Sequence, residues 1–548
     1  MKTIATMLCL AVLVVSGLTA FGMTDFSAVT DAKAENLIQN TPSDFASGDL
    51  SNIAIDYNGT LTIDDTRFGA QDSIFAANWT AEGNQASADF GWSVANAGDV
   101  NCDGFDDVIV GAYQYSHGEA SEGRTFVYLG TPSGLSISPS WTAESDQADA
   151  EFGFSVAGAG DVNGDGFDDV IVGAHHYSNG ETYEGQAYVY LGSSSGLSAI
   201  AAWTAESNVA NAYFGASVSC AGDVDGDGFD DVIIGAPGYT NGQSSEGRAY
   251  VYLGSPAGPS TTPLWTVESN QVSASYGFSV AGIGDVNGDG CDDIAVGSLF
   301  YDNGEIDEGK VFVYYGSSSG LSTTASWTAE SNQANAEFGR SVAGAGDVNG
   351  DGYDELAVGS PMYDNGENNE GRVFVFLGSS SGLSSTADWT VESNSIDANL
   401  GFSVSCAGDV DGNGFDDIII GAAFYTNGQT SEGKVYVYLG STSGLSSTPS
   451  WSEESNQGYA YYGLSVAGGG DANGDGYDEI ATGSYWYDSG ESNEGMAFVY
   501  YGGPKGVCNQ IEWTGESNQA SAEFGYSVAG AGDVNGDGFD DVIVGAHY

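Results

Sequence analysis

The apolar and polar positions of this chain follow one scheme that recurs along most of its length. In one copy, the apolar run at residues 169–174 shows no alternation, which indicates a strand buried on both faces. A first strand with an alternating pattern is predicted from residue 152, a third at residues 187–192 and a fourth at residues 199–203. Residues 177–185 contain Asn-Gly, which favours a tight antiparallel connection. The pattern predicts four antiparallel strands per copy, as in one blade of a β-propeller.

The scheme repeats every 62 residues without an insertion. Three features mark each copy: a tryptophan, a Phe-Gly or equivalent pair, and an acidic loop that begins with aspartate. An unbroken period of this kind indicates identical units packed against one another. The tryptophans are Trp79, Trp141, Trp203, Trp265, Trp327, Trp389, Trp451 and Trp513, and the loops begin at Asp99, Asp161, Asp223, Asp285, Asp347, Asp409, Asp471 and Asp533.

We expect an all-β fold, a β-propeller of four-stranded antiparallel blades. The last copy ends at Tyr548 after two predicted strands, and residues 52–63 are predicted to form a hairpin around Asn58-Gly59. Two strands from each end would complete a composite closing blade, so seven whole copies and one composite predict eight blades. Seven blades, and a chain cut short within its last copy, remain the alternatives.

The N-terminus predicts export. Lys2 precedes an apolar run at residues 4–15, and small residues follow the run, as in a cleavable signal peptide. The run is too short for a comfortable transmembrane helix. We divide the chain into a signal peptide (1–22), a leader (23–50) and a propeller of 62-residue repeats (51–548). We expect a secreted or cell-surface protein with no direct insertion into the membrane.

The charge of the chain argues against two classes of partner. It has 76 acidic and 10 basic residues and a formal net charge of −66. Nucleic acid and anionic lipid attract proteins through positive charge, so neither is an expected partner. An odd number of cysteines follows the predicted signal peptide, at positions that do not suggest pairing, so a disulfide scaffold is not expected.

Each acidic loop has the pattern D-x-[ND]-x-[DN]-G-x-x-[DE]. Oxygen ligands at positions 1, 3 and 5, a backbone carbonyl at position 7 and a carboxylate at position 9 can surround one hard cation. Without a cation, carboxylates placed so close together would repel one another. Ligation by oxygen alone favours Ca²⁺ over zinc, which prefers histidine or cysteine. The further carboxylate at position 8 is expected to have a structural role.

The sequence therefore predicts up to eight Ca²⁺ ions. Asn413 replaces aspartate at position 5 of the sixth loop, and Glu355 and Glu479 replace it at position 9 of the fifth and seventh loops. The predicted ligands are Asp99, Asn101, Asp103, Phe105 and Asp107; Asp161, Asn163, Asp165, Phe167 and Asp169; Asp223, Asp225, Asp227, Phe229 and Asp231; Asp285, Asn287, Asp289, Cys291 and Asp293; Asp347, Asn349, Asp351, Tyr353 and Glu355; Asp409, Asp411, Asn413, Phe415 and Asp417; Asp471, Asn473, Asp475, Tyr477 and Glu479; Asp533, Asn535, Asp537, Phe539 and Asp541.

The sequence contains no pattern that predicts catalysis. Glutamates recur three residues after each tryptophan, from Glu82 to Glu516, and again before a glycine, from Glu122 to Glu494. A catalytic carboxylate pair is needed once, in one pocket, so this recurrence predicts hydrogen bonding between blades instead. Basic residues two positions after the second glutamate are expected to be local ion-pair partners. No nucleophile or base pattern surrounds the histidines, which are interpreted as structural or surface residues: His117, His175, His176 and His547.

Together these features resemble FG-GAP repeats, the blades of the propeller at the head of integrin α subunits. The resemblance rests on the Phe-Gly pair, the acidic loop and the Gly-Ala or Gly-Ser after the second strand, as at Gly173-Ala174 and Gly297-Ser298, and it spans residues 79–548. It implies calcium in loops on one face of the propeller and ligand contacts on the opposite face. Integrin-type heads usually have seven blades, only some of them with calcium. The sequence predicts no stalk, transmembrane helix or cytoplasmic tail, and its near-identical units resemble secreted bacterial FG-GAP proteins more closely.

We therefore expect an extracellular calcium-binding propeller that acts as an adhesion or protein-recognition module and is not an enzyme. A multivalent, lectin-like propeller that binds sugars is the first alternative, and a polysaccharide-active enzyme is a weaker one. The expected partner is an extracellular protein or glycan. Aromatic segments at residues 459–462 and 485–487 are candidate contacts, although strand packing explains them equally well.

Overall fold

The computed structural model describes residues 53–55, 61–63, 81, 85, 88–489, 492–508, 511–517 and 519–547. The predicted signal peptide, the leader and Trp79 lie outside these residues. Within them all regular structure is strand, which confirms the all-β prediction, and no helix long and apolar enough to cross a bilayer is found. The strands are β1 (Ile53–Ile55), β2 (Leu61–Ile63), β3 (Phe90–Gly98), β4 (Asp107–Ala112), β5 (Arg124–Tyr128), β6 (Trp141–Glu144), β7 (Phe152–Gly160), β8 (Asp169–Ala174), β9 (Gln186–Tyr190), β10 (Trp203–Glu206), β11 (Ser217–Gly222), β12 (Asp231–Ala236), β13 (Arg248–Tyr252), β14 (Trp265–Glu268), β15 (Ser279–Gly282), β16 (Ile294–Ser298), β17 (Lys310–Tyr314), β18 (Trp327–Glu330), β19 (Ser341–Gly344), β20 (Leu356–Ser360), β21 (Arg372–Phe376), β22 (Trp389–Glu392), β23 (Ser403–Gly408), β24 (Asp417–Ala422), β25 (Lys434–Tyr438), β26 (Trp451–Glu454), β27 (Val466–Gly470), β28 (Glu479–Ser484), β29 (Met496–Tyr500), β30 (Ile511–Glu516), β31 (Phe524–Gly532) and β32 (Asp541–Ala546).

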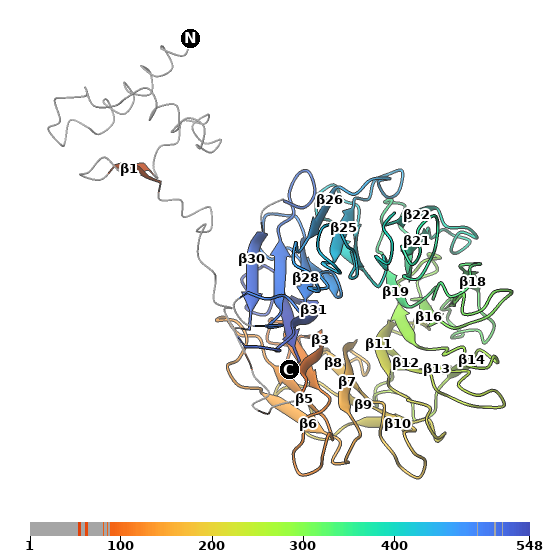
Figure 1. Ribbon diagram of the computed structural model, residues 1–548. Helices are drawn as coiled ribbons and strands as arrows, with labels where there is room; N and C mark the ends of the chain where they lie inside the picture. The colour runs from red at the N-terminus through yellow and green to blue at the C-terminus, as the bar shows by residue number, and fades with distance from the viewer. Residues whose placement is uncertain are drawn as a thin grey trace, which may run out of the picture. The chain divides into compact units, whose positions relative to one another are not determined.

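Seven sheets of four antiparallel strands are arranged around a central axis, as in a β-propeller (Figure 1). Each sheet takes its four strands in chain order. In the second blade the order is β7-β8-β9-β10, with Val170 opposite Tyr190 and Val189 opposite Trp203. The first strands of neighbouring units, such as β3 and β7, contact each other near the axis.

The eighth copy contributes a two-stranded sheet, β31–β32, which lies between β27 and β3 and closes the ring (Figure 1). In the described residues, β1 and β2 form a sheet of their own, with Ile53 opposite Ile63. The predicted composite eighth blade is therefore wrong, and the alternative of seven four-stranded blades is confirmed. The hairpin lacks the aromatic-Val-aromatic run of a third strand, as at residues 188–190, and the tryptophan of a fourth strand.

In six of the seven blades the fourth strand begins at the tryptophan, and in the seventh β30 begins two residues before it, whereas the sequence predicted that the strand ends there. In the second blade the strand runs Trp203–Glu206. The indole N–H of Trp203 donates to the carbonyl of Ser260 at 2.8 Å, and its ring packs edge-on against Tyr252 of the next blade, with centroids 4.6 Å apart. These contacts anchor the tryptophan between blades, and the strand starts from that anchor.

Neighbouring blades pack through their second and third strands. All six residues of β8 are buried. Ile171 and Val189 belong to one apolar cluster with Phe214 of the next unit. The approach is closest at Gly173, where a Cβ would lie 2.0 Å from the carbonyl oxygen of Gly215 in the next unit. Only glycine fits there, which explains the glycine of the Gly-Ala or Gly-Ser pair that ends the second strand of each unit.

Candidate calcium loops and the opposite face

Every acidic loop joins the first strand of a unit to the second, so all eight lie at the same end of the ring. In the second loop, the carboxylate of Asp161 at position 1 accepts the N–H groups of Gly164, Asp165 and Gly166, at 2.7, 3.1 and 2.7 Å. Gly166 at position 6 has φ +87°, a conformation that favours glycine. The loop therefore wraps around the position-1 carboxylate in the manner of a cation-binding turn.

The position-9 carboxylate forms the buried end of the first seven loops, and in the eighth loop Asp541 is half-buried. Asp169 has no exposed surface and accepts the N–H groups of Val162 and Gly192, at 3.0 and 2.7 Å. Burial raises the pKa of Asp169 to about 7, and it raises the pKa of Asp231 and of Glu355 to about 8. Each of the two oxygens of Asp169 keeps a lone pair beyond its backbone hydrogen bond. A carboxylate this deeply buried is costly to ionise unless a cation lies beside it.

Positions 5 and 7 complete the loop. Asp165 is exposed, and its carboxylate accepts the N–H of Phe167 at 3.2 Å. Asn413, the one substitution at position 5, accepts the N–H of Phe415 in the same way at 2.9 Å. The side chain at position 7 packs on the preceding loop, because the ring of Phe229 lies 2.3 Å from where a Cβ of residue 164 would be. At position 7, the carbonyl is therefore the group that remains for a cation.

The predicted ligands converge to different degrees. In three loops, three carboxylates offer oxygen atoms within 4.8 Å of one another, and in the third loop Oδ1 of Asp225 is buried with no hydrogen-bond partner. In the other five loops the described residues hold no carboxylate triad this close, and asparagine occupies position 3 in each. An orphaned carboxylate oxygen among other carboxylates is an environment that a hard divalent cation satisfies, so the donor set fits calcium. The three triads are Asp223, Asp225 and Asp231; Asp347, Asp351 and Glu355; and Asp409, Asp411 and Asp417.

The position-8 carboxylate links each loop to its neighbour. Asp168 accepts the N–H of Asp99 in the preceding loop at 2.9 Å. The same contact recurs around the ring and closes it, because Asp106 accepts the N–H of Asp533 at 2.9 Å although the two residues are 427 positions apart. Position 8 therefore has the structural role that the sequence analysis assigned to it.

The carboxylates of the recurrent glutamates bond within their own blade, so the predicted bonding between blades is wrong for these side chains. Only backbone carbonyls of the second set bond across blades, as where Glu308 accepts the N–H of Phe338 in the next unit at 3.1 Å. Glu330 lies opposite Lys310 across β17 and β18, with Nζ and Oε2 3.0 Å apart, and it also accepts the side-chain amide of Asn303 at 2.7 Å. Glu308 is buried and accepts the backbone N–H of Asn303. The recurrence thus reflects a repeated contact within the blade, and Lys310 is the local ion-pair partner expected.

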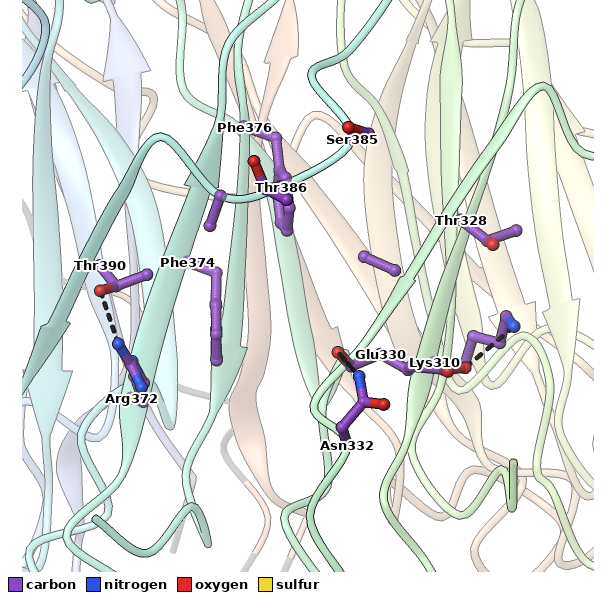
Figure 2. Close-up of a pocket in the computed structure, with 12 residues that line it drawn as sticks. Lys310, Thr328, Glu330, Asn332, Arg372, Phe374, Phe376, Ser385, Thr386 and Thr390 are labelled. Carbon is purple, nitrogen blue, oxygen red and sulfur yellow. Dashed lines mark hydrogen bonds and ion pairs between the residues drawn. The ribbon is translucent and has the colours of Figure 1, made fainter. Parts of the chain in front are cut away.

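A cavity of about 400 Å³ lies between the fourth and fifth blades (Figure 2). Lys310 and Glu330 line one side, and Arg372, Phe374 and Thr390 line the other. Arg372 donates to Thr390 at 2.8 Å and lies 5.2 Å from the centroid of the Phe374 ring. Lys310, which pairs with Glu330, and Arg372 are therefore both already bonded within their own blades.

The end of the ring opposite the loops carries a continuous set of aromatic contacts. Trp92, at the start of β3, stacks on Tyr526 with centroids 4.6 Å apart and contacts Phe154 at 5.5 Å. Tyr485 lies 5.5 Å from Tyr526 and stacks on Tyr461 at 5.4 Å. We call this set the aromatic face, and its members are Trp92, Tyr113, Phe154, Phe402, Phe424, Tyr461, Tyr485, Trp486 and Tyr526.

Sequence reasoning found only part of the aromatic face. Of the predicted contact segments, residues 461, 485 and 486 belong to it, whereas Tyr462 is a core residue with 1% exposure and Tyr487 packs on Phe498. Trp92 and Tyr526 were missed. The signal that could have found them is the position directly after the Phe-Gly pair, which varies although its surroundings repeat: Trp92, Phe154, Ala216, Phe278, Arg340, Phe402, Leu464 and Tyr526.

Known proteins share this sequence pattern. Integrin alpha pat-2 of Caenorhabditis briggsae is 34% identical over 221 residues, which cover 37% of this chain and 17% of that protein. Integrin alpha-5 of Xenopus laevis is 35% identical over 227 residues, which cover 40% of this chain and 20% of that protein. The matched region therefore spans about a fifth of the length of these relatives or less.

Two solved structures also align, at low similarity. A crystal structure of BBS1N in complex with ARL6DN is 12% identical, covers 71% of this chain and 88% of that chain, and has a TM-score of 0.39. The exotype rhamnogalacturonan lyase YesX is 12% identical, covers 80% of this chain and 84% of that chain, and has a TM-score of 0.29.

The FG-GAP repeat matches eight segments that together exceed half of the chain. Each segment starts at or within three residues of the Phe-Gly or equivalent pair, and the first seven end with the third strand. The segments are residues 90–128, 152–190, 214–252, 276–314, 338–376, 402–438, 462–500 and 524–548. They coincide with the eight units of the ring, and the chain belongs to the FG-GAP repeat family.

Proposed function

We propose that this chain is a calcium-stabilised recognition module that binds an extracellular protein through its aromatic face. The observation that carries the proposal is the continuity of that face around the axis. Trp92, Phe154 and Tyr526 come from three successive units of the ring, yet the ring of Trp92 contacts both of the others. All members of the face are half-buried, so each offers part of its ring to a partner. Partly exposed aromatic rings held in place by their neighbours are typical of protein-binding surfaces.

Variation among the copies supports the same surface. The loop positions scarcely differ between units, whereas the residue after the Phe-Gly pair ranges from Trp92 and Phe154 to Ala216 and Arg340. This position lies seven residues before the loop along the first strand, roughly 23 Å away at the rise of an extended strand. Units that are otherwise alike thus present different side chains at one end, which suits an asymmetric ligand better than a repeated sugar.

Calcium in the loops would stabilise the module. In the third loop, Asp223, Asp225 and Asp231 would hold the ion together with Asp227 and the carbonyl of Phe229. The ion would supply the positive charge that lets the buried carboxylates ionise. Because position 8 joins each loop to the next, order in one loop supports its neighbours. Loops of this type are therefore proposed to serve stability, at the end of the ring away from the ligand.

The relatives support adhesion as the biological context. The matching proteins are named as integrin alpha chains, and the match covers only a minor part of their length. We accordingly propose a secreted or cell-surface location and no enzymatic activity. A glycosidase would need a pair of free carboxylates in one pocket. Here the recurrent glutamates are bonded to side chains of their own blade, as Glu330 is to Lys310 and Asn303.

Binding of the labelled chain to an array of matrix proteins and glycans tests the proposal. The expected result is a calcium-dependent signal on protein that Trp92→Ala and Tyr526→Ala abolish. Ile200→Ala is the matched control, because Ile200 is apolar, 81% exposed and outside the aromatic face. A signal confined to glycans would favour the lectin alternative. Protein binding that survives both aromatic substitutions would overturn the assignment of the aromatic face.

A further inference from the structure

Two of the four histidines of the chain share a glutamate beside the aromatic face. His175 and His176 follow β8 directly, and Glu151 precedes β7. Nε2 of His175 lies 3.4 Å from Oε2 of Glu151, and Nδ1 of His176 lies 3.1 Å from Oε1 of the same carboxylate. The three side chains offer one ligand atom each, all within 4.8 Å of one another.

We propose that Glu151, His175 and His176 bind one divalent transition-metal ion, represented here by zinc. Two ligand atoms at about 2.1 Å from a tetrahedral ion lie roughly 3.4 Å apart, which is close to the separations already present. Two imidazoles and one carboxylate form the ligand set of an open zinc site, in which water or a ligand group takes the fourth position. Calcium, which takes six or more oxygen ligands, suits this set poorly.

The backbone of the site is held in place without a metal. The N–H of His176 donates to the carbonyl of Ala150 at 3.3 Å, and the N–H of Tyr177 donates to Ala174 at 3.1 Å, which fixes the turn after β8. Glu151 has φ +56°, and its N–H donates to the carbonyl of Ser121 at 3.2 Å. Both backbone segments that carry the ligands are therefore positioned before an ion arrives, as a designed metal site requires.

Ion pairing explains the cluster less well than metal binding does. The His175 side chain is 11% exposed, and its ring lies 3.9 Å from that of Phe154. Such a buried site beside an aromatic ring disfavours a charged imidazolium, and a neutral imidazole has a lone pair to donate. Nδ1 of His175 is buried and has no hydrogen-bond partner. In the tautomer with the ring proton on Nδ1, the lone pair of Nε2 faces the carboxylate and is free to bind an ion.

The eighth copy provides an internal comparison. Glu523 and His547 occupy the positions equivalent to residues 151 and 175, with His547 Nε2 3.0 Å from Glu523 Oε2. The next residue is Tyr548, where the second copy has a histidine. Among the eight copies, the sequence therefore completes the three-ligand set in the second copy alone.

Zinc titration by calorimetry tests the site, using the full chain without an affinity tag and with Ca²⁺ in excess to occupy the acidic loops. We expect one zinc equivalent that His176→Gln weakens roughly 100-fold or more, since loss of an outer-shell partner alone costs about 10–100-fold. His547→Gln should leave zinc affinity unchanged. Co²⁺ in place of zinc should give the intense visible absorption of a four- or five-coordinate ion, and His176→Gln should abolish it.

The His176 side chain is 27% exposed, so its substitution is expected to preserve the fold, which the thermal transition in calcium will verify. Glu151→Gln is a second variant of unchanged shape. The proposal is overturned if the parent chain binds no zinc equivalent in the presence of calcium. Equal zinc affinity in the parent and in both variants would overturn it as well.

Discussion

Without calcium, the free energy of unfolding of the ring should decrease as the pH rises from about 5 to about 8, the range in which the buried carboxylates titrate. Asp169 has no exposed surface, and burial raises its pKa from 3.8 to about 7. In this range the folded state holds a proton that the unfolded chain has lost. The contribution to stability is therefore fully present below pH 3.8 and is lost as the pH rises through about 7.

The size of the effect follows from the shift in pKa. At about 1.36 kcal/mol per pKa unit, ionising Asp169 in a folded, metal-free loop costs at most about 4 kcal/mol. The pKa of the position-9 carboxylate is raised in all eight loops, to values from about 6 for Asp541 to about 8 for Asp231. Their combined cost exceeds the net stability of roughly 5–15 kcal/mol of an ordinary domain. We therefore expect the metal-free loops to open before pH 8, and we expect bound calcium to prevent this.

Thermal unfolding of chain decalcified on a chelating resin, followed by circular dichroism at constant NaCl, measures the effect. The transition temperature should fall at each higher pH without calcium and should stay level with it. Ordinary carboxylates are ionised in both states above about pH 5, so they contribute little to the fall. Mg²⁺ controls for charge screening and should restore less stability, because it keeps its waters. A metal-free transition temperature that is constant across this range would refute the reasoning.

Three further predictions concern the packing of the ring. Asp106→Ala removes the acceptor for the N–H of Asp533, and we expect faster hydrogen exchange in β31 and β32, with a loss of about 1–3 kcal/mol in urea unfolding. Gly173→Ala places a Cβ 2.0 Å from a backbone oxygen and should destabilise the fold by about 3 kcal/mol or more, whereas Gly180→Ala, which meets no atom within 4 Å but has φ +101°, should cost about 1–2 kcal/mol. Lys310→Met should lower the free energy of unfolding in urea by about 1–3 kcal/mol, because it removes the cation paired with Glu330, whose side chain is only 18% exposed.

The repeat allowed most of the fold to be predicted. The constant period, the apolar run at residues 169–174 and the turn after it specify a blade, and the structure has those strands. The closing blade could not be predicted from a count of strands, because pairing depends on side chains that fill the next interface. Trp203 shows the same dependence: its indole contacts with Ser260 and Tyr252 decide where the fourth strand begins, and those partners come from another blade.

The loops were predictable in their residue types but not in their contacts. The residue at position 9 was expected to be a ligand. Its hydrogen bond from Gly192 and its burial depend on the connection between the third and fourth strands, which lies outside the loop and its pattern. The same holds for position 8, whose partner is the neighbouring loop. Ligand spacing is a local property of the sequence, whereas burial and pKa depend on the whole ring.

Departures from the repeat carry the information about function that the repeat itself cannot carry. A residue present in every copy, such as the glutamate opposite Lys310, is explained by a contact that every blade makes. A residue that interrupts the period has no such explanation, and in this ring several interruptions lie together at the end opposite the loops. Trp92 and Tyr526 meet there, and so do the ligands of the proposed metal site. Since the loop end of each unit is nearly constant and the opposite end differs from copy to copy, we propose that the opposite end is where one ligand is distinguished from another.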